Sequence, residues 1–359
     1  MQIIVESKIK NYSIAVQTNF DFLGELAQVT PRVVVIDKNV WTCYEQILLQ
    51  FFNKDELILF EATEVNKTVE KALELCDSIM NANAKKNMTI ISIGGGIVQD
   101  VSGFLSSILY RGVNWIFVPT TLLAQSDSCM GSKTSINYGG FKNLLGTFYP
   151  PTQIFINVAF TKTLSDLDFY SGIGEVVKLH LMGGEKNLEL ISSKIKKIRS
   201  CRDDIAFLTD IVQNSLSIKY SFIKEDEFDM GRRNLLNYGH CFGHALEVAA
   251  DYAIPHGTAV VVGMLFANLI AVKRGVLSKE KETSIRTDVL LHSYNFHFKK
   301  EYFNKDVIFS ALKMDKKRIG EGLPLILIQN NLDLIKILDM TPEELFWGID
   351  EVIDLLIKK

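Results

Sequence analysis

The sequence has few cysteines, and they form no recognisable motif. Five cysteines occur in 359 residues, with no CxxC spacing among them. An odd, scattered set argues against a disulfide framework and against a zinc ribbon. We therefore expect a protein of a reducing compartment, the cytoplasm, and we assign no role to these cysteines. They are Cys43, Cys76, Cys129, Cys201 and Cys241.

The sequence also lacks a membrane-spanning run, a targeting signal and an excess of charge of one sign. No uninterrupted apolar stretch reaches the roughly 18 residues that a spanning helix needs. The N-terminus has no basic stretch followed by an apolar run. With 39 basic and 42 acidic residues, the overall field favours neither nucleic acid nor an anionic membrane. We expect a soluble protein that binds neither.

The first part of the chain alternates short apolar strands with helical patterns, which is typical of a parallel sheet covered on both faces. The length predicts two domains, since one per roughly 150 residues is usual. The predicted strands are Arg32–Asp37, Leu57–Phe60, Met88–Ile93 and Trp115–Val118, and the predicted helices are Tyr44–Phe52 and Thr68–Asn83.

From about Phe160 onward the pattern is mostly helical, and the proline-containing segment Tyr149–Asn157 is the expected hinge. The sequence thus predicts a Rossmann-like α/β domain over residues 1–155 and a mostly α-helical, metal-binding domain over residues 156–359. The predicted helices are Thr163–Met182, Leu188–Ile198, Asp204–Ile223, Asn234–Asp251 and Gly257–Arg274.

Three polar loops follow predicted strands. The first is the glycine turn Gly94–Gly96, which leads into a helix, and the others are Pro119–Thr121 and Asp37–Asn39. In a parallel sheet the carboxyl ends of the strands form the ligand-binding edge, where glycines let backbone amides approach a phosphate. A plain tight turn explains the glycines nearly as well, but three such loops together favour a nucleotide.

Three of the six histidines lie within 17 positions. His240 and His244 are four apart, so on a helix they face the same way. His256 follows a short loop, and Glu175 stands in an otherwise apolar helical pattern. A lone histidine is more often a structural residue, but histidine and carboxylate ligands with an open position suit a catalytic divalent cation.

Several cations lie near glycines and polar residues rather than on a helix face. Surface solvation is the ordinary explanation for any one of them, whereas several gathered beside a metal would hold a phosphate or carboxylate. The set is Arg111, Lys133, Lys142, Lys178, Lys219, Arg233, Lys316 and Lys317.

Ordered blocks of the sequence resemble the 3-dehydroquinate synthase family of sugar-phosphate cyclases from about Asp37 to Lys317. The blocks are GGGIVQD, RGVNWIFVPTTLLAQSDS, GSKTSIN, KNLLGTFYPP, SGIGEVVK, RRNLLNYGHCFGHALE, PHGTAVVVGM and MDKK. The resemblance implies that Glu175, His240 and His256 bind zinc or cobalt. It implies that His244 is an acid/base or phosphate-contacting residue.

The resemblance also implies NAD and substrate sites, and a homodimer whose other subunit supplies Arg111. The positions similar to the family's NAD site are Asp37, Asn39, Glu64, Lys67, Gly95, Gly96, Asp100, Thr120, Thr121, Leu123, Asp127, Lys142 and Thr163. Those similar to its substrate site are Asp127, Lys133, Asn143, Lys178, Lys219, Arg233, Asn237, His244 and Lys316.

The implied reaction converts the seven-carbon keto-acid phosphate DAHP to 3-dehydroquinate, a step of the shikimate pathway towards aromatic amino acids. NAD⁺ oxidises a ring hydroxyl, phosphate is eliminated, the hydride returns, and the opened ring closes by aldol addition. NAD is therefore regenerated at each turnover. Arg233 with Asn237 suits the substrate carboxylate, because arginine binds carboxylates in a bidentate manner.

The chain departs from the family's usual pattern near the expected substrate. It has Ser132 where Gly is usual, Gln99 where Gly is common, an altered loop at 137–142, and His180, to which we assign no role. A cyclase acting on sedoheptulose 7-phosphate or another sugar phosphate is therefore the nearest alternative. A polyol dehydrogenase of the glycerol dehydrogenase type fits less well, because it needs no cluster of cations. A non-catalytic NAD-binding protein would not need the histidines.

Overall fold

The computed structural model describes residues 2–82, 85–314 and 322–357. The chain forms two compact units: Met1–Leu164 with Asp203–Phe228, and Ser165–Arg202 with Asp229–Lys359. These ranges differ from the predicted domains, 1–155 and 156–359, chiefly in the segment 203–228. Its helix α7 (Ile205–Glu225) packs on the first unit and pairs there through Lys219 with Asp127.

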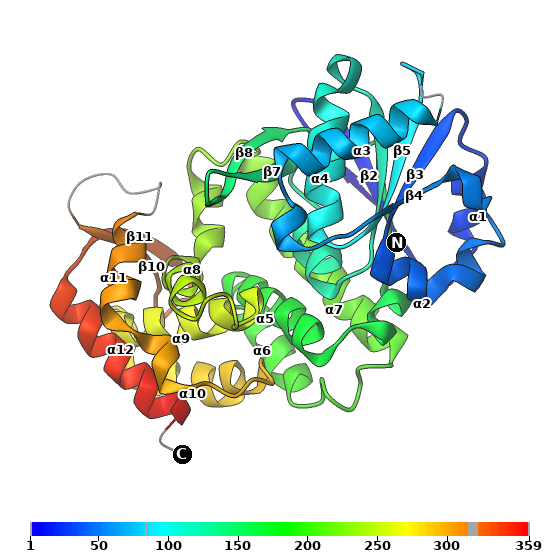
Figure 1. The fold of residues 1–359 in the computed structure, drawn as a ribbon. Coiled ribbons are helices and arrows are strands. Elements are labelled where there is room, and N and C mark those ends of the chain that lie inside the picture. The colour runs from blue at the N-terminus through cyan, green and yellow to red at the C-terminus, as the bar shows by residue number, and fades with distance from the viewer. Residues whose placement is uncertain (1, 83–84, 315–321, 358–359) are drawn as a thin grey trace. The chain divides into compact units, whose positions relative to one another are not determined.

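The first unit contains a seven-stranded sheet in the order β1-β2-β9-β6-β5-β3-β4 (Figure 1). Only the β1–β2 pair is antiparallel; the other neighbours are parallel. This confirms the predicted parallel α/β sheet. The strands are β1 (Gln2–Val5), β2 (Tyr12–Gln17), β3 (Arg32–Asp37), β4 (Leu57–Phe60), β5 (Thr89–Gly94), β6 (Asn114–Pro119) and β9 (Gln153–Asn157).

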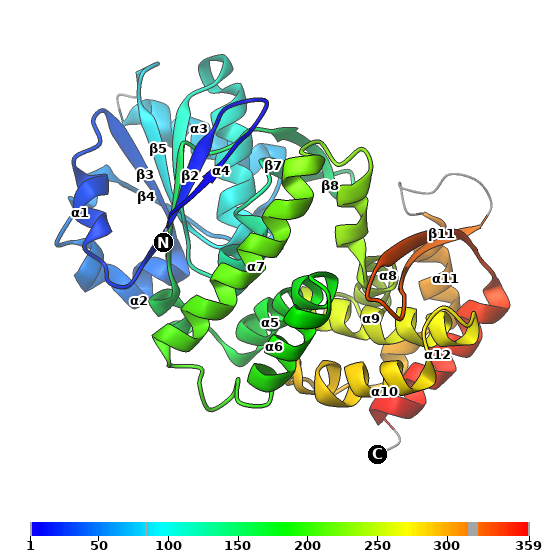
Figure 2. The ribbon, with the colours of Figure 1, turned by 180° about the vertical axis from the view of Figure 1, so that it is seen from behind.

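The central strands are apolar along nearly their whole length because both faces of the sheet are covered. Val33–Ile36 of β3 and Ile90–Ile93 of β5 are buried at every position, as expected for a parallel sheet between helices. Helix α7 lies on the face opposite α4 (Figures 1 and 2). The helices of this unit besides α7 are α1 (Phe22–Ala27), α2 (Lys38–Leu48), α3 (Val69–Asn81) and α4 (Gly96–Ile108).

Two features of this unit differ from the sequence-based expectation. Helix α2 begins at Lys38 and ends at Leu48 rather than spanning Tyr44–Phe52, because Asp37 caps it by accepting a hydrogen bond from the Asn39 amide at 2.9 Å. An antiparallel hairpin, β7 (Lys133–Tyr138) with β8 (Phe141–Phe148), was not predicted. Its β8 strand is largely exposed and therefore carries little of the apolar pattern that marks a strand.

The second unit is mostly helical, as predicted. Its central helix α9 (His256–Lys273) is, in the described part of the chain, the one helix long and apolar enough to cross a membrane, and 78% of it is buried in the structure. It packs against α5, α8, α10 and α12 and is therefore the core helix of the unit. The others are α5 (Asp166–Met182), α6 (Glu185–Ile195), α8 (His240–Ala249), α10 (Lys279–Asp288), α11 (Lys305–Lys313) and α12 (Pro342–Ile357).

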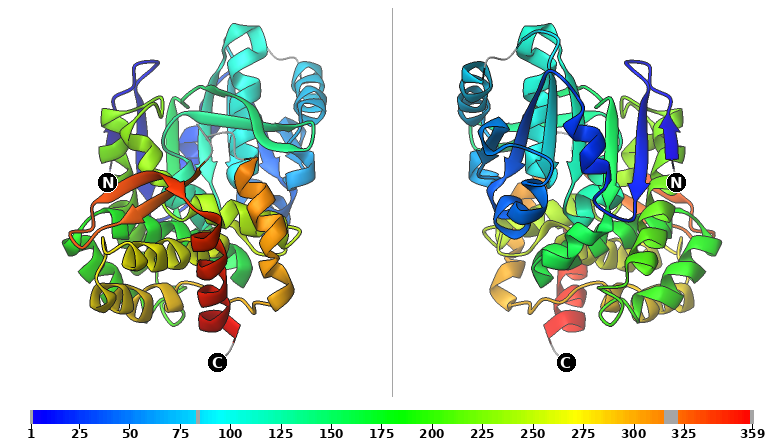
Figure 3. Two further views of the ribbon diagram at one scale, coloured as in Figure 1. Left: turned by 90° about the vertical axis from the view of Figure 1, so that its left-hand side faces the viewer. Right: turned by 90° about the vertical axis from the view of Figure 1, so that its right-hand side faces the viewer.

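The helix predicted over Asn234–Asp251 is interrupted in the structure. A 3₁₀ turn (Arg232–Asn237) precedes α8, and Gly239 between them has φ of +79°, which only glycine adopts readily. A second hairpin, β10 (Leu323–Ile328) with β11 (Leu334–Met340), was also not predicted. It is drawn in orange-red in Figure 3 and packs through β10 against α8 and α9.

Candidate active site

The second unit brings a carboxylate and three imidazoles together from three helices. Glu175 of α5 is 2% exposed, and its Oε1 lies 3.3 Å from Nε2 of His240 on α8 and 3.1 Å from Nε2 of His256 on α9. The ring nitrogens of His240, His244 and His256 lie within 4.8 Å of one another. Each of the predicted ligands is therefore within reach of one point.

Outer partners orient two of these imidazoles. Nδ1 of His256 lies 3.0 Å from Oε1 of Glu247, and Nδ1 of His240 lies 3.2 Å from the Tyr238 carbonyl oxygen. Each Nδ1 is thereby engaged, and each Nε2 faces Glu175. A metal-binding histidine usually has this arrangement, with one nitrogen held by a carboxylate or carbonyl and the other presented to the ion. The donor set fits a divalent cation such as zinc or cobalt.

The electrostatics of the cluster also fit a cation. Burial alone would raise the pKa of Glu175, but the charges of Lys178 and His240 and two hydrogen bonds lower it well below its usual value. Burial lowers the pKa of His256, yet hydrogen bonds to Glu175 and Glu247 raise it to about 10. A proton on His256 therefore supplies positive charge beside the two carboxylates, whereas burial and the charge of Lys178 lower the pKa of His240.

Backbone contact between α5 and α9 sets the distance between Glu175 and His256. A Cβ on Gly174 would lie 2.1 Å from the Gly257 carbonyl oxygen, and one on Gly257 would lie 1.7 Å from the Ser171 oxygen. Both glycines stand directly beside a predicted ligand. Any side chain here would push the helices apart, so the glycines of the SGIGEVVK and PHG blocks are needed to bring the two ligands together.

We predict that Gly174→Ala destabilises the second unit and weakens its metal site. The added methyl group would meet backbone that cannot move aside, at a cost on the order of 1–3 kcal/mol or more. Thermal unfolding and zinc affinity measure both effects. Gly24→Ala in α1 is the control, because its Cβ would meet Phe51 at an ordinary 3.7 Å. An unchanged melting temperature for Gly174→Ala would contradict the packing argument.

Two more predicted residues lie close to this cluster. Lys178 is one turn beyond Glu175, is 3% exposed in its side chain, and places Nζ 2.5 Å from Glu175 Oε2. His244 is exposed on α8, and its ring centroid lies 5.3 Å from that of His240 and 5.5 Å from that of His256. An exposed imidazole beside a buried ligand cluster can bind a metal or exchange a proton with a bound molecule. The geometry of the nitrogens allows either role.

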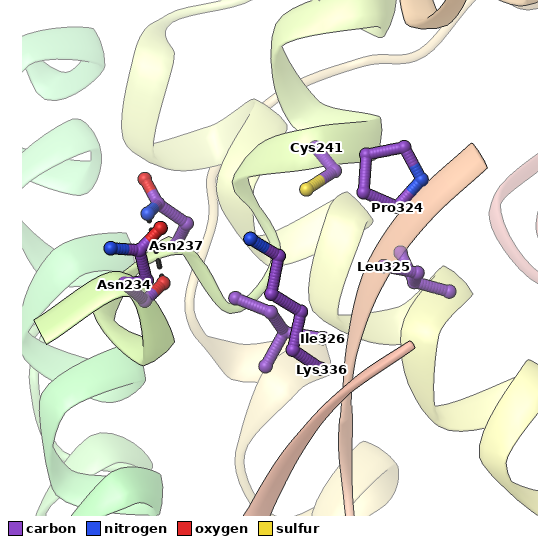
Figure 4. A pocket seen from close by; sticks show the side chains of 7 residues that line it. All are labelled: Asn234, Asn237, Cys241, Pro324, Leu325, Ile326 and Lys336. Carbon is purple, nitrogen blue, oxygen red and sulfur yellow. Dashed lines mark hydrogen bonds between the residues drawn. The ribbon is translucent and has the colours of Figure 1, made fainter. Parts of the chain in front are cut away.

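The predicted carboxylate-binding residues lie on the 3₁₀ turn that leads into α8. Arg233 is buried, and Asn237 donates from Nδ2 to the Asn234 carbonyl oxygen at 2.8 Å. Asn237 lines a small pocket together with residues of β10 and β11 (Figure 4). Because His240 follows Asn237 by three residues, one short segment carries both the expected carboxylate contacts and a predicted metal ligand.

The first unit gathers the predicted loops at one edge of its sheet. Strands β6, β5 and β3 are parallel neighbours, so the turns after them lie side by side. A Cβ on Gly95 would lie 2.9 Å from Cγ2 of Thr121, and the Thr120 amide donates to the Gly94 carbonyl oxygen at 2.9 Å. Gly95 also precedes the first turn of α4. The edge thus offers backbone amides at a helix N-terminus, which suit a pyrophosphate.

A network of polar side chains joins three predicted residues to the hairpin β7–β8, which carries a fourth, Asn143. Nζ of Lys67 lies 2.5 Å from Asp100 Oδ2 and donates a hydrogen bond to Asn143 Oδ1 at 2.7 Å. Asp100 accepts from the amide and hydroxyl of Ser135 at 3.0 and 2.8 Å. Glu64 accepts from Asn137 at 2.8 Å. Burial raises the pKa of Asp100, although Lys67 and the hydrogen bonds from Ser135 oppose the shift, so this network surrounds a buried carboxylate.

The predicted pair Asp127 and Lys219 is in contact. Asp127 lies in a π-helical turn (Ala124–Ser128), and Lys219 of α7 forms an ion pair with its carboxylate and donates to its carbonyl oxygen at 2.5 Å. Gln99, one of the departures from the family, donates to the Ser128 carbonyl oxygen at 2.7 Å and accepts from its hydroxyl at 2.8 Å. It thereby ties the first turn of α4 to the turn that carries Asp127. Isolated π-helical turns often occur at functional sites.

The remaining predicted residues are more dispersed. Asp37 and Asn39 form the N-terminal cap of α2, Leu123 precedes the π-helical turn, and the Thr163 hydroxyl donates to the Tyr44 hydroxyl at 3.2 Å. Lys133 and Lys142 are exposed on β7 and β8, and Arg111 is in a 3₁₀ turn. Lys316 and Lys317 lie outside the described residues.

Sequence reasoning missed Glu247, Ser135 and Asn137. Glu247 follows His240 by seven residues, a spacing that returns to the same helical face, so the α8 pattern contained a signal for it. Ser135 and Asn137 offered no signal, because their partners Asp100 and Glu64 are distant in sequence.

Comparisons with known proteins identify the family of this chain. Residues 57–171 match the family model described as 3-dehydroquinate synthase N-terminal, and residues 172–318 match the C-terminal one. A 3-dehydroquinate synthase from Clostridium tetani is 33% identical over 352 residues, covering 96% of this chain and 93% of that protein.

Solved structures show the same fold. A 2-epi-5-epi-valiolone synthase from Streptomyces hygroscopicus with NAD⁺ and Zn²⁺ bound has a TM-score of 0.86 at 23% identity, covering 98% of this chain and 99% of that one. A 2-deoxy-scyllo-inosose synthase complexed with carbaglucose-6-phosphate, NAD⁺ and Co²⁺ has a TM-score of 0.83 at 23% identity, covering 99% and 100%.

Proposed function

This chain belongs to the 3-dehydroquinate synthase family, and we propose that it is an NAD- and divalent-metal-dependent sugar-phosphate cyclase that converts DAHP to 3-dehydroquinate and phosphate. The observation that carries the proposal is the cluster of Glu175, His240 and His256, whose imidazoles are oriented by outer partners. The buried Arg233, on the 3₁₀ turn that leads into α8, supports a substrate that bears a carboxylate.

The residues of the second unit would hold the metal and the substrate anions. Glu175, His240 and His256 would bind zinc or cobalt, and Glu247 keeps His256 in the orientation that presents Nε2. When bound, the cation supplies positive charge that stabilises developing alkoxide and enolate character. Lys178, Arg233 and Asn237 would bind substrate, and His244 would exchange a proton or contact the phosphate.

The residues of the first unit would bind NAD. The glycine turn at the start of α4 would accommodate the pyrophosphate, and the cap of α2 would lie at the same sheet edge. When bound, NAD⁺ accepts a hydride and returns it within one turnover. The paired Asp127 and Lys219 would contact substrate. Homodimer formation, with Arg111 supplied by the partner, stays a prediction.

The charge of the site separates this function from that of a polyol dehydrogenase. A polyol carries no anion, so the buried cations Lys178, Lys219 and Arg233 would have no substrate group to bind. A sugar-phosphate cyclase with another substrate is the nearer alternative. Ser132 supports this alternative substrate, because the residue stands where glycine is usual and adopts φ of +63° beside Lys133.

Phosphate release by purified enzyme tests the proposal. The zinc- or cobalt-loaded protein with NAD⁺ would be offered DAHP, sedoheptulose 7-phosphate and glucose 6-phosphate separately. We expect turnover of DAHP without net accumulation of NADH. Turnover of another sugar phosphate instead would retain the cyclase chemistry and refute the DAHP assignment. Steady NADH production from a polyol would refute the cyclase assignment itself.

A further inference from the structure

The small pocket of the second unit lies between the 3₁₀ turn with α8 and the hairpin β10–β11, and its lining surface is mostly apolar. Figure 4 shows Asn234, Asn237 and Cys241 on the side of the 3₁₀ turn and α8, and the strand residues on the other side. Asn237 is one of the predicted substrate contacts. The strand wall consists of Pro324, Leu325 and Ile326 of β10 together with Lys336 of β11.

Among the residues that the structure describes, Lys336 is the one cation that lines this pocket. It is paired in register with Ile326, and Figure 4 shows its side chain extending from β11 towards the wall formed by Asn237 and Cys241. Its neighbours along the strand, Ile335 and Ile337, are apolar. Within the described part of the chain, the Lys336 ammonium makes no hydrogen bond or ion pair.

The nearby acidic groups are already engaged elsewhere. Asp339 of the same strand pairs with Arg274 at 2.7 Å, and Asp333 accepts from Asn331 at 2.7 Å. An ammonium that extends over an apolar pocket wall without a protein partner gains most from an anion bound in the pocket. Arg233 is buried and therefore offers a fixed contact. Lys336, on an exposed strand, instead supplies a mobile point charge.

We propose that Lys336 binds an anionic group of the substrate together with Asn237, and so contributes to substrate selection. This inference rests on the proposed function, since it assigns the pocket to the same sugar phosphate. The group is a carboxylate or a phosphate, which share the same recognition chemistry. Because Lys336 lies outside the segments on which the family resemblance is based, it is a contact that those segments do not supply.

The test compares Lys336→Met and Lys336→Arg with the wild type in the holoenzyme. We expect Lys336→Met to raise the KM for DAHP by about 10-fold, the effect of losing one charge-assisted contact, with kcat nearly unchanged. Lys336→Arg should recover much of this loss. The difference between the wild type and Lys336→Met should shrink at high salt, because exposed charges are screened. Lys186→Met, an exposed lysine of α6, is the control.

A comparison of two substrates identifies the anionic group that Lys336 binds. A KM effect on DAHP but not on sedoheptulose 7-phosphate would identify the carboxylate, and equal effects on both would identify the phosphate. A wild type that turns over DAHP with a Lys336→Met variant indistinguishable from Lys186→Met would overturn this inference alone. A wild type that turns over no sugar phosphate would overturn both the proposed function and this inference. Circular dichroism and thermal unfolding would show whether the variants are folded.

Discussion

Replacing His256 with alanine is expected to remove the bound metal and the activity together. Its Nε2 lies 3.1 Å from Glu175, and its Nδ1 lies 3.0 Å from Glu247, so the variant loses a proposed ligand and the imidazole that bridges these two buried carboxylates. Metal content after dialysis and phosphate release measure the two losses. A metal-loaded, active His256→Ala protein would show that His256 is not a ligand.

Two further variants make this prediction specific. His244→Ala should keep the metal and lose activity, whereas a loss of metal would make His244 a ligand, as the spacing of the three imidazoles permits. Glu247→Gln should weaken metal binding by about 10–100-fold, the usual effect of losing an outer partner. His292→Ala, an exposed histidine outside the cluster, should change neither property.

Replacing Arg233 with alanine is expected to lower kcat/KM for DAHP by roughly 30- to 1000-fold. This corresponds to about 2–4 kcal/mol of transition-state stabilisation, the cost of truncating one partner of a buried charge pair. The neighbouring Arg232→Ala is the control, because Arg232 is exposed whereas Arg233 is buried. Arg233→Ala should lose far less activity with a sugar phosphate that has no carboxylate.

The comparison of substrates separates a binding role of Arg233 from a structural one. If Arg233 only supported the fold, Arg233→Ala would lower activity towards every substrate and lower the melting temperature. An unchanged kcat/KM for DAHP in a folded variant would show that Arg233 does not meet the carboxylate. Arg233→Lys should recover part of the loss, because lysine keeps the charge without the bidentate geometry.

Local sequence patterns predicted the elements that are apolar throughout. The runs RVVVID and MTIISI became β3 and β5 because a strand buried on both faces needs apolar residues at each position. The same patterns did not predict a helix break caused by a single glycine or a strand that is largely exposed. Gly239 divided the helix predicted over Asn234–Asp251, and the exposed strand β8 had no apolar alternation to reveal it.

By itself, the sequence determined the family, the α/β sheet with a helical second part, and the chemistry of the donor set. These depend on residue types in ordered blocks and on periodicity within single elements, which are local properties. Only the tertiary structure decided that α7 belongs to the first unit, that Glu247 orients His256, and that Lys336 lines the pocket beside Asn237. Each of these depends on which distant segments pack together, and packing between distant segments leaves no regular spacing in the chain.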